Sequence, residues 1–167
     1  MADGRNRIKV LLLLTSTSGG TGQHAYYLTK YLDKSEFDLT VAFGTGHPLD
    51  DEIEKLGVRV IPLSFSRRVS PLRNLHGFLQ IYRLMRRESF DLVCIGNAIA
   101  GFLGRIAAWL ARMPARVFII HSFASHRHQP PIKRLVYRAM ERAMNPLTHR
   151  YIAVAEAMKR FGVEQRI

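Results

Sequence analysis

The residues that could carry chemistry are a glycine-rich segment near the amino terminus and two histidines. Gly19, Gly20 and Gly22 follow an all-apolar run and precede a helical pattern. Glycines at such a junction let the chain turn sharply and leave backbone amides uncovered at the positive end of a helix, where a phosphate or carboxylate binds readily. His121 stands directly after another apolar run, and His24 lies near the start of the expected helix. An imidazole at either position can accept a proton or form a hydrogen bond with a sugar hydroxyl.

Short apolar runs and segments with helical spacing alternate along the whole chain, as expected for strands and helices that follow one another. The expected strands cover residues 8–14, 37–43, 58–61, 91–95, 115–120 and 151–154. The expected helices cover residues 23–32, 49–56, 71–87, 98–112, 131–143 and 155–161. This order predicts an α/β fold, a Rossmann-like doubly wound parallel sheet of about six strands. Ligands of such sheets bind at the carboxyl ends of the strands, where the glycine segment and His121 fall.

Composition limits the classes of partner. The 167 residues suffice for one domain, residues 1–167, and carry a formal net charge of +12. Such a charge points to an anionic partner: nucleic acid, a phosphorylated ligand or an anionic membrane. The single cysteine, Cys94, permits no intrachain disulfide and is expected in the core. No run approaches the roughly 20 apolar residues of a membrane span, and a cytoplasmic location is expected.

The sequence lacks residues that the two common nucleotide-binding motifs require. The stretch from Gly20 to Ala25 fits the dinucleotide pattern G-x-G-x-x-A. However, the second strand has no acidic residue at its carboxyl end, because Glu36 and Asp38 lie at its other end. A P-loop is excluded because no Gly-Lys-Ser or Gly-Lys-Thr follows the glycines. An NAD(P)-binding oxidoreductase domain and a tight turn without ligand remain as alternatives.

A metal site is not expected from the histidines. His121, His126 and His128 match no standard zinc spacing and have no cysteine or acidic partner nearby in the sequence.

Five segments in this order resemble a known family. They are Ser18-Gly-Gly-Thr-Gly22, Leu56-Gly-Val-Arg-Val-Ile-Pro-Leu63, Asp91-Leu-Val-Cys-Ile-Gly-Asn97, Ile119-Ile-His-Ser122 and Tyr151-Ile-Ala-Val154. Together they are similar to the N-terminal, acceptor-side domain of GT-B glycosyltransferases, and most similar to family 4. The resemblance implies transfer of a sugar, with retention at the anomeric carbon, from a UDP- or GDP-sugar to a glycan or lipid-linked acceptor. The Gly-Gly-Thr-Gly-Gln-His segment also resembles the Gly-Gly-Thr-Gly-Gly-His of the family that builds the lipid-linked peptidoglycan precursor.

The resemblance assigns roles to individual residues. The glycine-rich segment would lie at the interdomain cleft, near the donor diphosphate and the acceptor. It comprises Ser18, Gly19, Gly20, Thr21 and Gly22. His121 would be the catalytic-site histidine close to the transferred sugar, while His24, Asn97 and Ser122 would lie on the acceptor side. Neither a metal ion nor another cofactor is implied. Ala155 departs from the family, which usually has a serine after the sixth strand.

The helices at 71–87 and 131–143 carry rows of basic residues. These are Arg73, Arg83, Arg87, Lys133, Arg134 and Arg138. They are expected to face outward, either as an ordinary solvated face or against an anionic membrane. The second helix would then pack an apolar stripe on the sheet, formed by Ile132, Leu135, Val136, Ala139, Met140 and Ala143. No nucleic-acid recognition motif accompanies the charge, and nucleic acid is not the expected partner.

These observations predict the acceptor-binding half of a retaining, nucleotide-sugar-dependent glycosyltransferase that acts on a lipid-linked or cell-envelope glycan at the inner face of a membrane. The C-terminal, donor-binding domain of that family is absent from the 167 residues, so this half alone is expected to be inactive. A non-catalytic, membrane-recruiting subunit of a split glycosyltransferase is the alternative.

Overall fold

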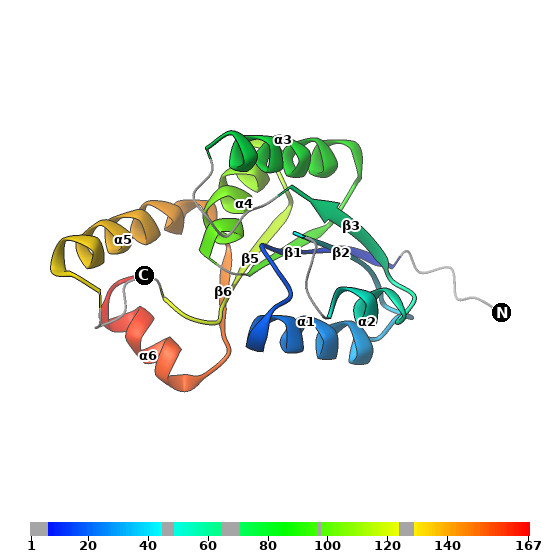
Figure 1. The fold of residues 1–167 in the computed structure, drawn as a ribbon, viewed down its shortest axis with the longest axis horizontal. Coiled ribbons are helices and arrows are strands. Elements are labelled where there is room, and N and C mark those ends of the chain that lie inside the picture. Colours follow the sequence, from blue (N-terminus) through cyan, green and yellow to red (C-terminus); the bar gives the residue numbers. More distant parts are fainter. Residues whose placement is uncertain (1–6, 45–48, 65–70, 97, 124–128) are drawn as a thin grey trace.

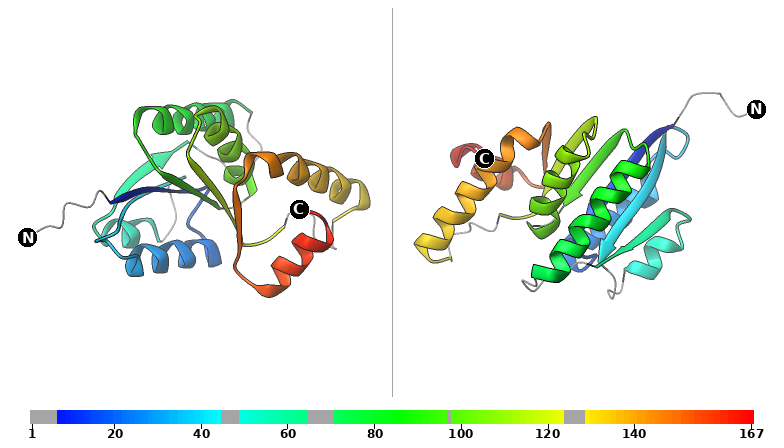
Figure 2. Two further views of the ribbon diagram at one scale, coloured as in Figure 1. Left: turned by 180° about the vertical axis from the view of Figure 1, so that it is seen from behind. Right: turned by 90° about the horizontal axis from the view of Figure 1, so that it is seen from above.

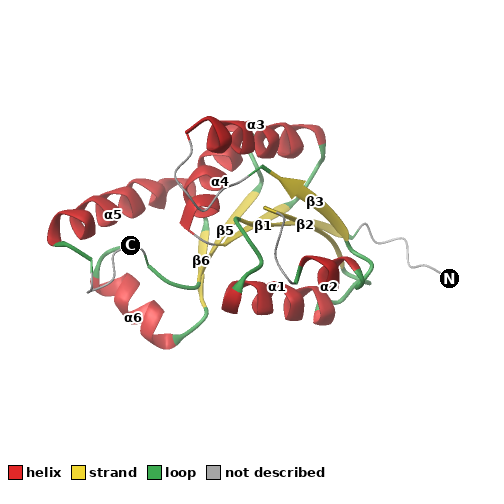
Figure 3. Cartoon of the chain, in the orientation of Figure 1, coloured by secondary structure: helices red, strands yellow, loops and turns green. Residues whose placement is uncertain are grey.

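The computed structural model describes residues 7–44, 49–64, 71–96, 98–123 and 129–167. In this part of the chain, six parallel strands form one sheet with helices on both faces (Figure 1, Figure 3). The strands are β1 (Ile8–Leu14), β2 (Phe37–Gly44), β3 (Arg59–Leu63), β4 (Leu92–Gly96), β5 (Ala115–Ile120) and β6 (Arg150–Ala153). The helices are α1 (Gly19–Tyr31), α2 (Asp50–Glu54), α3 (Pro71–Arg87), α4 (Ala98–Leu110), α5 (Pro131–Met144) and α6 (Glu156–Glu164), with a 3-10 turn at Asn145–Leu147. The predicted doubly wound, Rossmann-like α/β fold is confirmed.

Strand β1 is apolar throughout because both of its faces are buried. Leu11 and Leu13 pack in the core beneath α3 and α4, whereas Leu12 and Leu14 pack in the second core beneath α1 and α2. A strand covered on both sides needs a continuous apolar run rather than an alternating one. The run that predicted a buried strand therefore reflects two cores, one on each face of the sheet (Figure 1).

The centre of the sheet is the pair β1 and β4, in the order β3-β2-β1-β4-β5-β6. The backbone N–H of Lys9 donates to Oδ2 of Asp91 at 2.8 Å, and the N–H of Asp91 donates to the carbonyl of Lys9 at 2.9 Å. After β1 the chain proceeds toward β2, and after β4 it proceeds toward β5 (Figure 2). The carboxyl ends of β1 and β4 therefore flank the point where the strand order reverses, which is the usual ligand crevice of this fold.

Most element boundaries differ from the sequence expectation by one or more residues, and three of these differences are described here. Helix α1 begins at Gly19 rather than after Gly22, so the glycines form its first turn. Strand β3 continues through Pro62, which pairs with Phe43, and this is possible because β3 is an edge strand. Helix α6 runs to Glu164, three residues beyond the predicted end.

The predicted orientation of α5 is wrong. Ile132, Leu135 and Val136 are exposed, whereas Arg134 and Arg138 are half-buried. The reason is an ion pair on the inner face of the helix, in which Glu141 accepts a hydrogen bond from Nη2 of Arg105 at 2.7 Å. Arg105 belongs to α4, and its side chain is one of the largest fully buried ones. The polar face of α5 therefore turns toward the protein.

Two smaller expectations were also tested. Cys94 is buried in the core, as predicted, and burial raises the pKa of its thiol to about 11. None of the described helices is long and apolar enough to span a membrane.

Candidate functional site

The first turn of α1 presents its backbone to solvent at the carboxyl edge of the sheet. Gly19 has a φ of +66°, a conformation that residues with a Cβ rarely adopt, and both Gly19 and Gly20 are exposed. A Cβ at either glycine would meet no atom within 4 Å. Ser18, at the N-cap, forms no side-chain capping bond to this turn. The amides of the first turn, which have no partner within a helix, can therefore receive an anionic group.

Gly22 has a different role from its two neighbours. A Cβ at this position would lie 1.6 Å from the carbonyl oxygen of Thr17 and 2.8 Å from Cδ1 of Leu49. Gly22 is therefore required for the close approach of α1 to the segment that precedes it. Its presence in the motif reflects packing, whereas Gly19 and Gly20 leave open surface.

The hydroxyl-rich segment after β1 is used mainly to hold the site together. Oγ1 of Thr15 accepts a hydrogen bond from the N–H of Ala100 in the first turn of α4 at 2.9 Å. The hydroxyl of Thr17 donates to the carboxylate of Asp50 in α2, and the hydroxyls of Ser16 and Ser18 lie 3.2 Å apart. These contacts tie the end of β1 to helices on both faces of the sheet. All four hydroxyls of residues 15–18 therefore have partners within the protein.

The two candidate histidines meet beside the first turn of α1. The ring centroids of His24 and His121 are 5.1 Å apart, and the rings make an edge contact at 61°. His121 follows β5 directly, and its Nε2 atom is buried with no hydrogen-bond partner among the described residues. Gly96, at the end of β4, lies next to this imidazole: a Cβ there would be in ordinary contact with Nε2 of His121 at 3.5 Å, but only 2.8 Å from Cδ2 of Leu14, so the glycine is required mainly by packing against β1. The sequence placed both histidines at the correct edge but did not predict their contact.

Both imidazoles favour the neutral form. Burial lowers the pKa of His24, and the pKa of His121 is lowered by burial and, to a smaller extent, by His24. A neutral imidazole has one nitrogen that donates and one that accepts a hydrogen bond. The pair can therefore bind hydroxyl groups, and one of its members can take up a proton as a reaction proceeds.

An open cavity of about 380 Å³ joins these groups. It is lined by Gly20, Thr21, His24, His121, Ser122 and Val154. Five of these six residues were predicted from the sequence. Val154, which follows β6, was missed because an apolar residue in a strand pattern gives no sign that it borders a ligand site. Asn97, a predicted acceptor-side residue, lies outside the described residues.

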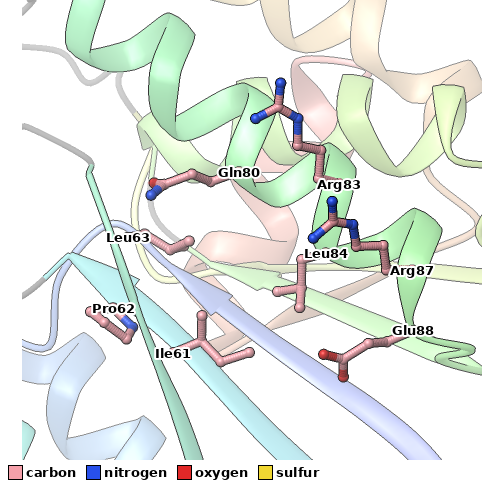
Figure 4. Close-up of a pocket in the computed structure, with 8 residues that line it drawn as sticks. All are labelled: Ile61, Pro62, Leu63, Gln80, Arg83, Leu84, Arg87 and Glu88. Atoms are coloured by element: carbon pink, nitrogen blue, oxygen red, sulfur yellow. The ribbon is translucent and has the colours of Figure 1, made fainter.

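The basic residues predicted to face a membrane lie away from this cavity, on α3 and α5. Arg73, Arg83, Arg87 and Lys133 are exposed. Arg83 and Arg87 border a second cavity of about 300 Å³ between α3 and the edge strand β3 (Figure 4). Apolar side chains of Ile61, Leu63 and Leu84 form part of its lining. No group of three or more His, Cys, Asp or Glu side chains that could hold a metal ion occurs in the described part of the chain.

Comparison with known proteins identifies sequence relatives and structural neighbours. The model of Glycosyltransferase Family 4 matches residues 18–166. An Escherichia coli relative is UDP-Gal:alpha-D-GlcNAc-diphosphoundecaprenol alpha-1,3-galactosyltransferase, which is 26% identical over 134 residues, covering 80% of this chain and 35% of the relative.

The structural neighbours include proteins from several bacteria. Anabaena Alr3699/HepE, in complex with UDP and glucose, has a TM-score of 0.71 at 18% identity, and the match covers 95% of this chain and 41% of that one. A glycosyltransferase from Rickettsia africae has a TM-score of 0.71 at 18% identity, and the match covers 98% of this chain and 41% of that one. MurG from Acinetobacter baumannii has a TM-score of 0.65 at 13% identity, and the match covers 90% of this chain and 42% of that one.

The chain thus spans less than half the length of these relatives. The fold of the described residues agrees with the fold of these enzymes, and the family model covers most of the sequence. The chain belongs to glycosyltransferase family 4 and has the Rossmann-like fold of the N-terminal half of a GT-B enzyme.

Proposed function

We propose that this chain is the acceptor-binding half of a retaining glycosyltransferase that uses a nucleotide-sugar donor. The observation that carries the proposal is the cavity in which the exposed first turn of α1 meets the imidazoles of His24 and His121. The named activity of the E. coli relative, which takes galactose from a UDP donor, supports a nucleotide sugar, and so does the UDP bound by Anabaena HepE.

In this proposal the amides of Gly19 and Gly20 bind a phosphate of the donor. The open surface at both glycines lets a diphosphate approach the backbone, and the positive end of α1 favours the negative charge that develops as the diphosphate leaves. An acceptor hydroxyl forms the new bond to the anomeric carbon on the face from which the diphosphate leaves, and its proton passes to an oxygen of the departing diphosphate as the old bond breaks. The remaining donor contacts would come from the second half of the enzyme.

His121 is the residue that we assign to the transferred sugar. Its buried Nε2 lacks a partner among the described residues, and a buried nitrogen without a hydrogen bond is costly in free energy. A sugar hydroxyl would supply that bond and fix the sugar beside the diphosphate. His24 and Ser122, which line the same cavity, are assigned to the acceptor, together with Asn97.

The acceptor that we propose is a lipid-linked glycan in polysaccharide biosynthesis at the cytoplasmic face of a membrane. The named substrate of the E. coli relative, a diphosphoundecaprenol-linked sugar, supports this choice. The positive charge of the chain and the arginines of α3 also favour an anionic membrane surface.

The experiment is sugar transfer by the product of the complete reading frame, with labelled UDP- and GDP-sugars and a detergent-dispersed, undecaprenyl diphosphate-linked acceptor. His121→Ala should lower kcat by about 100-fold, because a misplacement of the reacting groups by about 1 Å can cost that much. His76→Ala, an exposed histidine of α3, is the matched control and should leave kcat unchanged. Wild-type activity in the His121→Ala enzyme would refute the assignment, and inversion at the anomeric carbon, read by NMR, would refute retention.

A further inference from the structure

An exposed aromatic surface continues from the site cavity along the outer side of α1. Gly20 and His24 line the cavity, and Tyr27 and Tyr31 follow them at spacings of four, three and four residues. These spacings place the four residues in one row along an α-helix. The opposite side of α1 is buried and comprises Gly22, Ala25 and Thr29. The row therefore leads from the cavity outward, toward the far end of the helix.

The two tyrosine rings of this row, named here the tyrosine pair, are exposed and nearly parallel. Tyr27 retains 51% of its accessible surface and Tyr31 retains 71%. Their ring centroids lie 6.2 Å apart at an interplanar angle of 14°, so the rings are offset rather than superposed. Tyr26 makes an edge contact with Tyr27, and Nζ of Lys30 lies 5.4 Å from the centroid of Tyr31. These contacts hold two flat apolar surfaces in place in water.

The chemistry of this surface fits a sugar better than a lipid. A pyranose has a face of C–H groups that packs on the negative face of an aromatic ring, while its hydroxyls require hydrogen-bonding groups at the edge. The tyrosine hydroxyls, the exposed amide of Gln23 and the ammonium of Lys30 can provide those hydrogen bonds. Insertion among acyl chains would instead remove water from Gln23, His24 and Lys30, which is unfavourable.

We infer that the tyrosine pair binds the sugars of an acceptor glycan that lie beyond the sugar receiving the transfer. The receiving sugar occupies the cavity beside His24, and the following sugars pack along α1, which rises roughly 10 Å between His24 and Tyr31. This glycan site rests on the proposed function, because it takes the cavity as the acceptor site. It adds that the acceptor carries several sugars, and that Tyr27 and Tyr31 determine the preference for a longer acceptor.

The first test is the binding of soluble sugars to the 167-residue chain, which requires neither a donor nor catalysis. The probes are N-acetylglucosamine, the sugar named in the acceptor of the E. coli relative, and its linear tetramer, chitotetraose. In an NMR titration that follows the tyrosine ring signals, the tetramer should bind about tenfold more tightly than the monomer. Tyr27→Ala and Tyr31→Ala should each lower the affinity for the tetramer by about two- to tenfold and leave that for the monomer unchanged.

Two control variants separate ring stacking from other effects. Tyr31→Phe keeps the ring and should retain most of the affinity for the tetramer. Trp109→Ala removes a side chain that is 51% exposed, like Tyr27, but belongs to α4 on the other side of the sheet (Figure 1), and should leave tetramer binding unchanged. Circular dichroism verifies that each variant is folded.

Three results of the titration would overturn the inference. The first is a wild-type chain that binds the tetramer no more tightly than the monomer. The second is an equal loss of affinity in Trp109→Ala and Tyr31→Ala, since a general effect of removing an aromatic side chain would then explain it. The third is a loss in Tyr31→Phe as large as that in Tyr31→Ala, because the ring face would then contribute nothing.

A lipid surface is the competing occupant, since tyrosines also occur at membrane interfaces. Sedimentation with vesicles of phosphatidylcholine and phosphatidylglycerol distinguishes the two. If Tyr31→Ala weakens vesicle binding and leaves tetramer binding unchanged, the tyrosine pair contacts lipid and the inference is wrong. If it weakens tetramer binding alone, the glycan site is supported.

Turnover by the complete enzyme separates this inference from the proposed function. The acceptors are undecaprenyl diphosphate-linked N-acetylglucosamine and the same lipid carrying the tetramer, both dispersed in detergent. Tyr31→Ala should raise KM for the longer acceptor by about two- to tenfold, leave its kcat unchanged, and alter neither constant for the shorter acceptor. If Tyr31→Ala affects both acceptors equally while His121→Ala still lowers kcat, the inference fails and the proposed function stands. If no sugar is transferred but Tyr31 is still required for tetramer binding, the proposed function fails and the glycan-binding surface remains.

Discussion

The ion pair between Arg105 and Glu141 should contribute far more to stability than its exposed counterpart between Arg59 and Glu88. Arg105 and Glu141 retain 1% and 16% of their side-chain accessibility, whereas Arg59 and Glu88 retain 58% and 30%. The N–O distances are nearly equal, 2.7 and 2.6 Å. Both pairs join a guanidinium to a carboxylate, but the exposed pair has two hydrogen bonds and the buried pair has one. The comparison therefore tests whether burial outweighs the additional hydrogen bond.

We expect Glu141→Ala to lower the free energy of unfolding by about 3 to 5 kcal/mol, because it leaves the guanidinium of Arg105 buried without its counter-charge. The remaining contacts of Arg105, a hydrogen bond from Nε to the carbonyl of Gly101 and the face of the Phe118 ring 4.1 Å away, cannot replace a carboxylate. Glu88→Ala should cost about 0.2 to 1 kcal/mol, since water solvates Arg59 once its partner is lost.

The assay is urea unfolding followed by circular dichroism, with the free energies extrapolated to water. Replacing both members of the buried pair by methionine should recover much of the stability lost in Glu141→Ala, because no unpaired charge then remains. If Glu141→Ala and Glu88→Ala differ by less than about 1 kcal/mol, the reasoning from burial is refuted.

Three further predictions follow from the site and the core. Gly22→Ala should lower the free energy of unfolding by about 2 kcal/mol or more, because its Cβ would overlap the carbonyl of Thr17. Gly20→Ala, the control, should be within about 1 kcal/mol of wild type, since its Cβ would meet no atom. Equal midpoints of urea unfolding for the two variants would contradict this reasoning. The pKa of His121, followed by NMR of its Cε1 proton, should lie below 6.5. Because the unfolded chain then binds more protons, this histidine contributes stability above pH 6.5 that is lost as the pH falls below it; a midpoint at or above 6.5 would exclude the effect. Cys94, whose thiol pKa is about 11, should resist a thiol reagent at pH 8 until denaturant is added, and rapid native labelling would show that the core is open there.

Much of the fold was predictable because its signals are local. A strand buried on both faces must be apolar along its length, so β1 could be recognised from residues 8–14 alone. The position of His121 at the ligand edge followed from its place directly after an apolar run, because parallel strands end at a common edge.

The orientation of α5 could not be predicted in this way. The contact that determines it joins Arg105 to Glu141, 36 residues later, and the helix pattern by itself favoured burial of the apolar stripe. Likewise, the segment containing Gly19 and Gly22 gave no sign that the two glycines serve different purposes. That difference becomes apparent only from the structure, in which the carbonyl of Thr17 packs against α1 at Gly22. The cavity residue Val154 was missed for a similar reason, since its role depends on which strands are neighbours.

The reciprocal hydrogen bonds between Lys9 and Asp91 have a consequence for how the protein folds. These residues are 82 positions apart, and β1 has no neighbour on that side until β4 has been synthesised. Closing so long a loop is entropically unfavourable and tends to make folding slow. During translation, the backbone groups on one edge of β1 would therefore remain unpaired until more than half of the chain has been synthesised, while its leucines are still incompletely buried. A nascent chain in this condition is exposed to aggregation, and its dependence on chaperones should decline once β4 has emerged from the ribosome.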